Sequence, residues 1–249
     1  MDITAIVLTK NEEANLAQCL EGLTFCDEII VVDDFSTDRS LQIAKNFRVK
    51  VYQRKLDDDF AAQRNFALRH ARSNWVLFVD ADERVSPALR EEIVKKTKEV
   101  QESTSGFYLK RIDILWGKTL NHGETGNAKF VRLALRQAQS KWERAVHEVW
   151  QVKGRLATLK NPLFHYPHQS LREFLDDINY FSTLHAKANL EEGKRSNLIK
   201  IIFWPKLKFI QNYFLKLGFL DGTRGFVVAL LMSLHSFLSW GKLWKMTTK

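Results

Sequence analysis

Short apolar runs alternate with helical patterns over the first third of the chain. The run at residues 3–8 is rich in β-branched residues and predicts a buried strand. Further runs at residues 28–32, 49–53 and 75–79 predict three more strands. Because helical patterns lie between these runs, the sequence predicts an α/β fold, with a mostly parallel, doubly wound sheet flanked by helices.

Polar residues indicate where the helices begin. We expect Asn11 to cap the first helix, and residues 36–38 offer caps for the second. A helical pattern covers residues 60–71, and Ser86, with a proline after it, is expected to begin the next helix. In the later part of the chain, Ser170 is expected to begin a polar helix.

Polar side chains gather where the predicted strands end. Thr9 ends the first strand, Asp33 and Asp34 end the second, and the segment at residues 80–83 ends the fourth. In a doubly wound sheet the ligand site lies beyond the carboxyl ends of the strands. We therefore expect these side chains to line one site.

Asp80 and Asp82 are separated by one residue, so both carboxylates can face a shared divalent cation as the chain leaves its strand. Such a cation acts as a Lewis acid and stabilises the growing negative charge of a departing nucleoside diphosphate. A second acidic run, residues 57–59, follows two basic residues rather than a buried strand, and we interpret it as a solvated turn. The first pair predicts a Mg²⁺ or Mn²⁺ site.

The pattern changes in the second half of the chain. Strand-like pieces at residues 106–112 and 129–135 suggest a second half of the catalytic domain, and from Leu198 apolar and basic residues are mixed. We predict the following organisation: a catalytic domain at 1–168, with a nucleotide-binding half at 1–105 and an acceptor half at 106–168, followed by a helical, basic amphipathic region at 169–249.

The net charge of +9 is concentrated near the carboxyl end. After Gly193 there are ten basic residues and one acid, whereas residues 1–192 are neutral overall. This distribution argues against a nucleic-acid partner and favours binding of residues 194–249 to an anionic membrane surface. The alternative is an ordinary helical subdomain whose aromatic residues pack on the catalytic core.

Several classes of protein are disfavoured. The first residues lack a basic segment typical of a secretory signal, so we expect the domain to remain inside the cell. The apolar run at residues 225–234 stops at His235, short of the roughly 20 residues that span a bilayer. Cys19 and Cys26 are expected to be reduced thiols, and His165 and His168 to be structural.

The motifs together resemble those of the family-2 inverting glycosyltransferases of GT-A fold. Four segments that carry the resemblance occur in order: Thr-Lys-Asn-Glu-Glu at 9–13, Val-Asp-Asp-Phe-Ser-Thr-Asp at 32–38, Gln-Arg-Asn at 63–65 and Val-Asp-Ala-Asp-Glu at 79–83. Three more resemble segments of bacterial lipopolysaccharide core glucosyltransferases: Val-His-Glu at 146–148, Asn-Tyr at 179–180 and Gly-Phe-Leu-Asp-Gly at 218–222. The resemblance covers nearly the whole chain.

The resemblance implies a donor site. Thr9 and Asp34 match residues that hold the uracil and ribose of a UDP-sugar, and Arg64 matches an arginine near the base. Asp80 would lie by the ribose and the metal, and Asp82 would ligate the metal. Two further residues are assigned to donor binding, Asn11 and Ala81. Lys10 occupies a position that varies in this superfamily.

The resemblance also implies a catalytic base. Inverting transfer needs a group that takes the proton of the acceptor hydroxyl, and Glu148 of the His-Glu pair is our candidate. The alternative interpretation of Glu148 is a structural acid in a salt bridge. His147 is expected to contact the acceptor or to form structural hydrogen bonds, and the role of Glu83 stays open.

The resulting expectation is a metal-dependent hexosyltransferase, peripheral on the inner membrane in the bacterial cytoplasm. It would move a hexose, with glucose favoured, from a UDP-sugar to a lipid-linked saccharide of the lipopolysaccharide inner core. One alternative is a transferase for a protein or polyprenyl-phosphate acceptor. Another is a noncatalytic module that binds membranes or nucleic acid through its basic tail.

Overall fold

The computed structural model of the chain contains two compact units. The first comprises residues 1–111 and 129–165, and the second comprises residues 112–128 and 166–249. The boundary between these units is close to residue 168, but the second unit also includes the segment at 112–128. The domain division proposed from the sequence remains a prediction. The residues that the structure describes are 2–99, 104–124, 126, 128–137, 139–144, 148–168 and 170–248.

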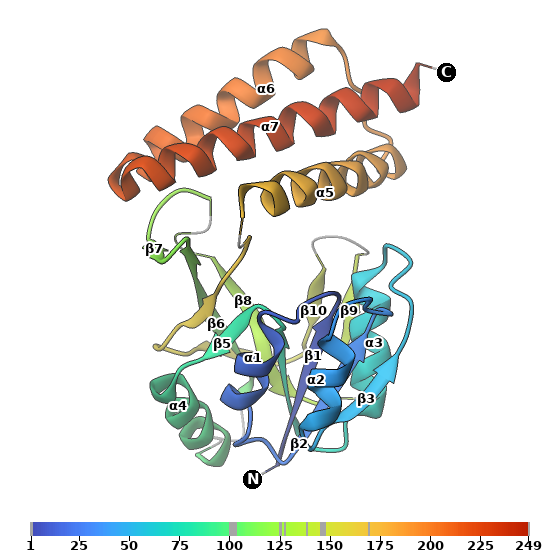
Figure 1. Cartoon of the computed structure of the whole chain (residues 1–249), viewed down its shortest axis with the longest axis vertical. Helices are drawn as coiled ribbons and strands as arrows, with labels where there is room; N and C mark the ends of the chain where they lie inside the picture. Colours follow the sequence, from blue (N-terminus) through green and yellow to red (C-terminus); the bar gives the residue numbers. More distant parts are fainter. Residues whose placement is uncertain are drawn as a thin grey trace. The chain divides into compact units, whose positions relative to one another are not determined.

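Four parallel strands form one half of the main sheet in the first unit (Figure 1). They are β1 (Ile3–Thr9), β2 (Glu28–Asp33), β3 (Lys50–Gln53) and β4 (Trp75–Asp80), in the order β3-β2-β1-β4. β1 pairs in parallel with both β2 and β4. The four strands predicted from the apolar runs are confirmed.

Antiparallel strands extend this sheet beyond β4. β8 (Lys129–Leu135) pairs with β4, and β6 (Thr104–Leu115) pairs with β8. β11 (Arg155–Thr158) lies parallel to β6. β5 (Glu83–Val85) pairs with β12 (Leu163–His165). The sheet is therefore mixed, and its four adjacent parallel strands β1 to β4 come from the first third of the chain.

Helices cover both faces of the sheet. Residues of α1 (Leu16–Gly22), α2 (Ser40–Asn46) and α4 (Pro87–Lys98) join one hydrophobic cluster with alternate residues of β1 and β4. α3 (Phe60–His70) packs in a second cluster with the opposite side chains of these strands. Because side chains alternate along a strand, the continuous apolar runs are buried on both faces, as a parallel sheet requires.

The helix starts predicted at Ser86 and Ser170 are confirmed, but the caps predicted at residues 36–38 are wrong, because α2 begins at Ser40 after Arg39. Ser86 and Ser170 cap α4 and α5 (Leu171–Glu191), each accepting a hydrogen bond from a backbone N–H three residues later. Asp59 caps α3 in the same way, and Asp57 has a positive φ of 51°, so the second acidic run is a turn. The prediction for Asn11 is wrong, because α1 begins only at Leu16.

A separate two-stranded sheet, β9 (Lys141–Glu143) and β10 (Val149–Gln151), belongs to the first unit. Trp142 and Trp150 lie opposite each other in this pair, and their rings stack with centroids 5.5 Å apart. Each tryptophan ring also packs in a T-shaped arrangement against the ring of Phe78 of β4, with ring centroids 4.9 and 5.0 Å apart. Aromatic packing thus attaches this small hairpin to the core.

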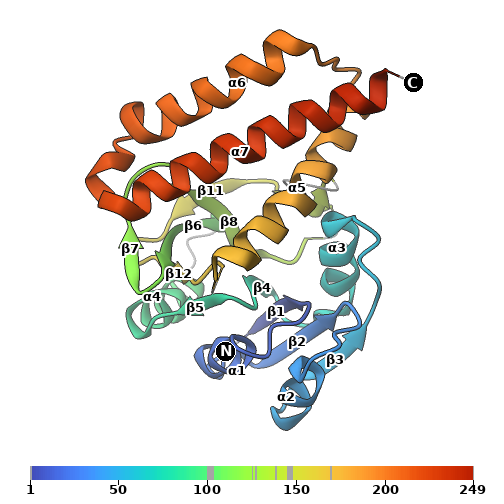
Figure 2. The same ribbon diagram turned by 45° about the horizontal axis from the view of Figure 1, so that its top comes forward.

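The second unit is mainly helical. It contains β7 (Lys118–Leu120), α5 (Leu171–Glu191), α6 (Leu198–Ile210) and α7 (Gly222–Thr247). α6 and α7 lie side by side, as Figure 2 shows, and α5 packs against α7. The predicted helical region is confirmed at the level of secondary structure.

Irregular segments make the turn between α6 and α7. A π-helix covers Gln211–Leu215, and a 3₁₀-helix covers Gly218–Asp221. A Cβ atom at Gly225 would lie 1.9 Å from the carbonyl oxygen of Gly218, so this close approach requires glycine. The hairpin turn therefore depends on Gly225, three residues after the Gly-Phe-Leu-Asp-Gly segment.

Among the described residues, one helical segment is long and apolar enough to cross a membrane by length and composition alone. It is Gly218–Thr247, with a mean hydropathy of 1.4 and 22% of its apolar window buried inside the protein. The apolar run of the sequence stops at His235, but the helix continues past it to Thr247. The expectation that no segment reaches spanning length is therefore wrong.

Candidate active site

The carboxyl ends of three neighbouring strands bring the predicted site residues to one edge of the sheet. In the strand register, Thr9 lies opposite Asp33, and Leu8 lies opposite Asp80. Asp34 follows directly and donates its backbone N–H to the carbonyl oxygen of Thr9 at 3.0 Å. Thr9, Asp34 and Asp80 therefore share one rim, as parallel strands require.

Asp80 is held by two buried arginines. Its Oδ1 accepts a hydrogen bond from Arg64 Nη2 at 2.8 Å, and its Oδ2 accepts one from Arg132 Nη2 at 2.7 Å. Arg64 comes from α3, on one face of the sheet, and Arg132 comes from the neighbouring strand β8. Both carboxylate oxygens of Asp80 are thus paired with guanidinium groups.

Arg64 also reaches the candidate base. Its Nε donates to Glu148 Oε1 at 2.8 Å, and its side chain is only 4% exposed. The guanidinium lies over the ring of Trp142, with its central carbon 4.8 Å from the ring centroid. The buried guanidinium of Arg64 therefore joins Asp80 and Glu148. Its predicted neighbour His147 lies outside the described residues.

Glu83, whose role the sequence left open, is fully buried beneath this cluster. Its Oε2 accepts the backbone N–H of Asp80 at 2.9 Å. Its Oε1 lies 3.5 Å from Arg132 Nη2 and 3.9 Å from Arg111 Nη1. Glu83 therefore contacts both the backbone of the turn at residues 80–83, called the acidic turn below, and the arginine that pairs with Asp80.

The charges of the cluster determine its protonation. Burial opposes the ionised form of Asp80, but the guanidiniums of Arg132 and Arg64 outweigh burial and hold the pKa of Asp80 far below its ordinary value. Burial raises the pKa of Glu83, although Arg132 acts in the opposite direction. Burial would lower the pKa of Arg132, but Asp80 and Glu83 raise it further above its ordinary value. Asp80 and Arg132 are therefore both charged at neutral pH.

Asp82 has a histidine partner. Asp82 Oδ2 and His165 Nε2 are 2.9 Å apart, and their side chains are 24% and 13% exposed. His165 ends β12, the strand that pairs with β5 directly after the acidic turn. His165 therefore contacts a candidate metal ligand, and its structural role remains a prediction.

The rim near Asp34 has a tightly bonded loop. Asp34 accepts the backbone N–H of Leu56 at 3.0 Å, and Lys10 Nζ lies 3.4 Å from its other oxygen. Asn11 Oδ1 accepts the backbone N–H of Thr37 at 2.8 Å, so Asn11 ties two loops together. Thr9 Oγ1 is buried and has no hydrogen-bond partner in the described part of the chain.

At residues 80–82, Asp82 is the side chain that could hold a divalent cation. No group of three or more His, Cys, Asp or Glu side chains forms a metal site among the described residues. Both oxygens of Asp80 already accept from arginines. Asp82 offers carboxylate oxygens, one of which contacts His165 Nε2, and the oxygens of a diphosphate would add more ligands. Oxygen ligands of this kind suit Mg²⁺ or Mn²⁺.

Sequence reasoning missed Arg132. A signal was present, because an arginine inside the apolar strand at residues 129–135 must find an acidic partner when it is buried. His168 agrees with its structural interpretation, since it contacts Asp177 at 3.0 Å and stacks on Phe174. Both cysteines are free thiols, and burial raises the pKa of Cys26 to about 12.

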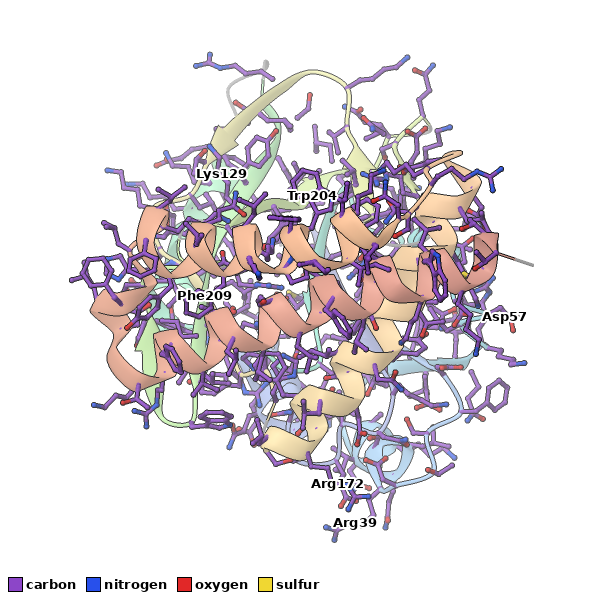
Figure 3. The ribbon with its side chains drawn as sticks, turned by 90° about the horizontal axis from the view of Figure 1, so that it is seen from above. Arg39, Asp57, Lys129, Arg172, Trp204 and Phe209 are labelled. Carbon is purple, nitrogen blue, oxygen red and sulfur yellow. The ribbon has the colours of Figure 1, made fainter. Side chains whose placement is uncertain are left out.

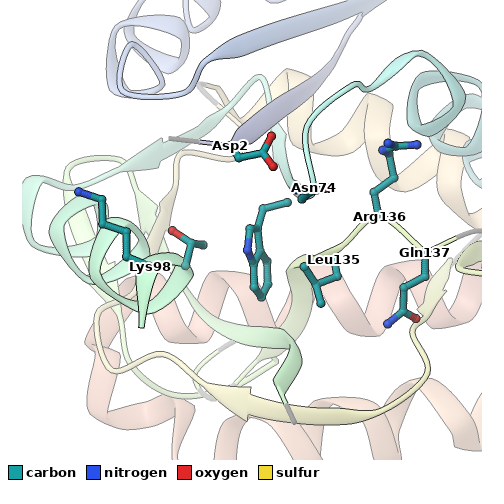
Figure 4. Close-up of a pocket in the computed structure, with 8 residues that line it drawn as sticks. Asp2, Asn74, Lys98, Leu135, Arg136 and Gln137 are labelled. Atoms are coloured by element: carbon teal, nitrogen blue, oxygen red, sulfur yellow. The ribbon is translucent and has the colours of Figure 1, made fainter. Parts of the chain in front are cut away.

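A pocket of about 480 Å³ in the first unit lies away from this cluster. Asp2 and Trp75 line it at the amino ends of β1 and β4, together with Lys98, Leu135 and Arg136 (Figure 4). The acidic turn follows the opposite, carboxyl end of β4. The pocket is therefore separate from the candidate active site.

The fold and the rim of acids define a known class of enzyme. The sequence profile of glycosyl transferase family 2 matches residues 4–153. The chain therefore belongs to this family and is a glycosyltransferase. The family expected from the sequence motifs is confirmed.

Relatives and solved structures agree with this assignment. The lipopolysaccharide core biosynthesis glycosyltransferase LpsC of Rhizobium meliloti is 27% identical, over 98% of this chain and 93% of that protein. A crystal structure of S. aureus TarS 1-349 in complex with UDP-GlcNAc has a TM-score of 0.50 at 17% identity, covering 95% of this chain and 82% of that chain. Mannosyl-3-phosphoglycerate synthase from Rubrobacter xylanophilus has a TM-score of 0.51 at 16% identity, covering 80% of this chain and 77% of that chain. These similarities confirm the GT-A fold.

Proposed function

We propose that this glycosyltransferase moves a hexose, glucose in our proposal, from a UDP-sugar to a lipid-linked saccharide of the lipopolysaccharide inner core. The observation that carries the proposal is the bridge formed by Arg64, which brings strand-end Asp80 and Glu148 to the same guanidinium. The name of the relative LpsC supports the class of acceptor.

Residues on the rim would hold the donor. Thr9, with its buried hydroxyl, and Asp34 would contact the uracil and ribose, while Asn11 fixes the loop beside them. Asp80 would face the ribose, and the turn through Ala81 would follow the diphosphate. Asp82, with His165 beside it, would hold Mg²⁺ or Mn²⁺. When bound, the cation would supply Lewis-acid stabilisation of the leaving diphosphate.

Glu148 would act as the base of an inverting transfer. The oxygen of the acceptor hydroxyl would form a bond to the anomeric carbon, and the bond from that carbon to the diphosphate oxygen would break. The proton of the hydroxyl would pass to the carboxylate of Glu148, and UDP would leave. Arg64 holds Glu148 through Oε1, which orients the carboxylate for this role.

The hairpin of α6 and α7 would bind the enzyme to the cytoplasmic side of the inner membrane. Large apolar side chains are exposed along both helices, and Figure 3 labels one of them, Trp204 on α6. Examples spaced at helical intervals are Ile199, Phe203 and Leu207 on α6 and Phe226, Leu230 and Phe237 on α7. The basic excess after Gly193 complements anionic lipid headgroups.

A screen of nucleotide sugars for thermal stabilisation, with and without Mn²⁺, tests the donor and the metal together. We expect UDP-glucose with Mn²⁺ to raise the melting temperature more than either component alone, because only the folded state binds them. Equal stabilisation by all nucleotide sugars, or no effect of Mn²⁺, would contradict the proposed donor site.

A further inference from the structure

Three consecutive polar side chains of α3 contact three different parts of the first unit. Gln63 and Arg54 form two hydrogen bonds. Gln63 Nε2 donates to the Arg54 carbonyl oxygen at 2.8 Å, and Arg54 Nη1 donates to Gln63 Oε1. Arg64 joins Asp80 and Glu148, as described above. Asn65 contacts β9. The Gln-Arg-Asn motif therefore connects α3 to the active site and to its surroundings.

Asn65 forms a reciprocal pair with the backbone of Trp142. Its Nδ2 donates to the Trp142 carbonyl oxygen at 2.8 Å, and its Oδ1 accepts the Trp142 backbone N–H at 2.8 Å. The side-chain amide thus satisfies both backbone groups of one residue, as a neighbouring strand would. A pair of this kind fixes the position of β9 along α3.

The β9–β10 hairpin needs such an attachment. It is a two-stranded sheet outside the main sheet, and an isolated pair of strands is only marginally stable in water. The rings of Trp142 and Trp150 attach it to Phe78, but the burial of apolar surface that drives this packing is non-directional. Hydrogen bonds are directional, so the Asn65 pair selects one position.

Glu148 immediately precedes β10, and Val149 pairs with Glu143 of β9. A shift of β9 along α3 would therefore move Glu148 relative to Arg64. We propose that Asn65 is a positioning residue, which holds β9 and, through β9 and β10, sets the Glu148 carboxylate at the site of transfer. This inference rests on the proposed role of Glu148 as the base.

The test is Asn65→Ala in the full-length protein, with Asn46→Ala as the matched control. Asn46 is an exposed amide at the end of α2. We expect Asn65→Ala to lower kcat roughly 10- to 100-fold, because displacing a catalytic group by about 1 Å costs a factor of this order. The KM for the donor and the calorimetric Kd for UDP should stay within about twofold of the wild type. Asn46→Ala should leave all of these values unchanged.

Hydrogen exchange of the Trp142 amide provides a readout that does not require activity. Asn65→Ala should speed this exchange, because the acceptor of the Trp142 N–H is removed. Wild-type kcat or wild-type exchange in Asn65→Ala would overturn the inference. If wild-type protein shows no transfer to any acceptor, the proposed function fails, while exchange still tests the attachment of β9.

If Asn65→Ala does not fold, Asn65→Asp provides the test. A carboxylate keeps an acceptor for the Trp142 N–H but cannot donate to the Trp142 carbonyl oxygen. We expect a smaller loss of kcat with unchanged UDP affinity. Turnover equal to that of the wild type in this variant would overturn the positioning role.

Discussion

Arg64 and Asp80 form the ion pair around which the site is arranged, with Nη2 and Oδ1 2.8 Å apart. Arg64 is buried between α3 and the sheet, so its charge depends on protein partners rather than on water. Asp80 and Glu148 are those partners, and each in turn gains a fixed orientation. The stability of this region and the geometry of the site therefore depend on the same side chain.

Replacing Arg64 with methionine should destabilise the protein by about 3 kcal/mol, because the carboxylates of Asp80 and Glu148 lose a charged partner. Urea unfolding of purified protein measures this free energy. Arg69→Met, at an exposed position of the same helix, should change it by less than about 0.5 kcal/mol. Equal effects of the two substitutions would contradict the structural role of Arg64.

Asp82→Ala should remove metal-dependent binding of UDP and leave the protein folded, because Asp82 is partly exposed and contacts His165. Calorimetry with UDP, with and without Mn²⁺, measures the effect. We expect the enhancement by Mn²⁺ to disappear. Asp57→Ala, in the turn at residues 57–59, should retain the enhancement of UDP binding by Mn²⁺. An unchanged affinity for UDP with metal in Asp82→Ala would defeat the assignment of Asp82.

Glu148→Gln should abolish most transfer while preserving donor binding. Glutamine is nearly the same size and can still contact Arg64 weakly, but it cannot take a proton from the acceptor hydroxyl. We expect a fall in kcat of about 100-fold or more, with the calorimetric Kd for UDP unchanged. Turnover close to that of the wild type would remove Glu148 as the base.

The sequence was sufficient to predict the parallel half of the fold and the rim of strand-end residues, because buried strands and their polar ends leave local signals. Thr9, Asp34 and Asp80 follow directly from this pattern. The partners of these residues could not be predicted in the same way. His165 reaches Asp82 across 83 positions of sequence, and Arg64 reaches Glu148 across 84, so only the folded chain brings them together.

Glu28 provides a test of stability against pH at a distance from the acidic turn. Burial opposes its ionised form, but hydrogen bonds from Lys50, Thr4 and the Arg72 backbone lower its pKa below the ordinary value of 4.5. The unfolded chain therefore takes up this proton at a higher pH than the folded protein does. The stabilisation by Glu28 is complete above about pH 4.5 and is lost as the pH falls through the lower, folded pKa.

Glu28→Gln should therefore lower the free energy of unfolding by about 1 kcal/mol at pH 7. The difference from the wild type should shrink progressively below pH 4.5, where the wild-type carboxyl also becomes neutral. Urea titrations at several pH values measure this difference. Glu21→Gln, at an exposed position of α1, controls for the loss of one charge. A difference that does not vary with pH would contradict the assignment.

The membrane proposal predicts that polar substitutions on the exposed face of the α6–α7 hairpin weaken vesicle binding. Phe203 and Phe237 are 55% and 46% exposed, one on each helix. Introducing aspartate at both positions should weaken binding to vesicles that contain anionic phospholipid by about 10- to 100-fold, because apolar contact is lost and charge repulsion is added. Sedimentation of protein with vesicles measures the partition coefficient.

Leu171→Asp is the matched control, since Leu171 is also half exposed but begins α5, where an acidic residue favours the helix. It should bind vesicles as the wild type does. Binding of the wild type should also weaken as salt rises, because the basic residues after Gly193 act through screened charges. If Phe203→Asp with Phe237→Asp binds normally, the hairpin face does not enter the membrane. Its exposed apolar residues would then require a protein partner.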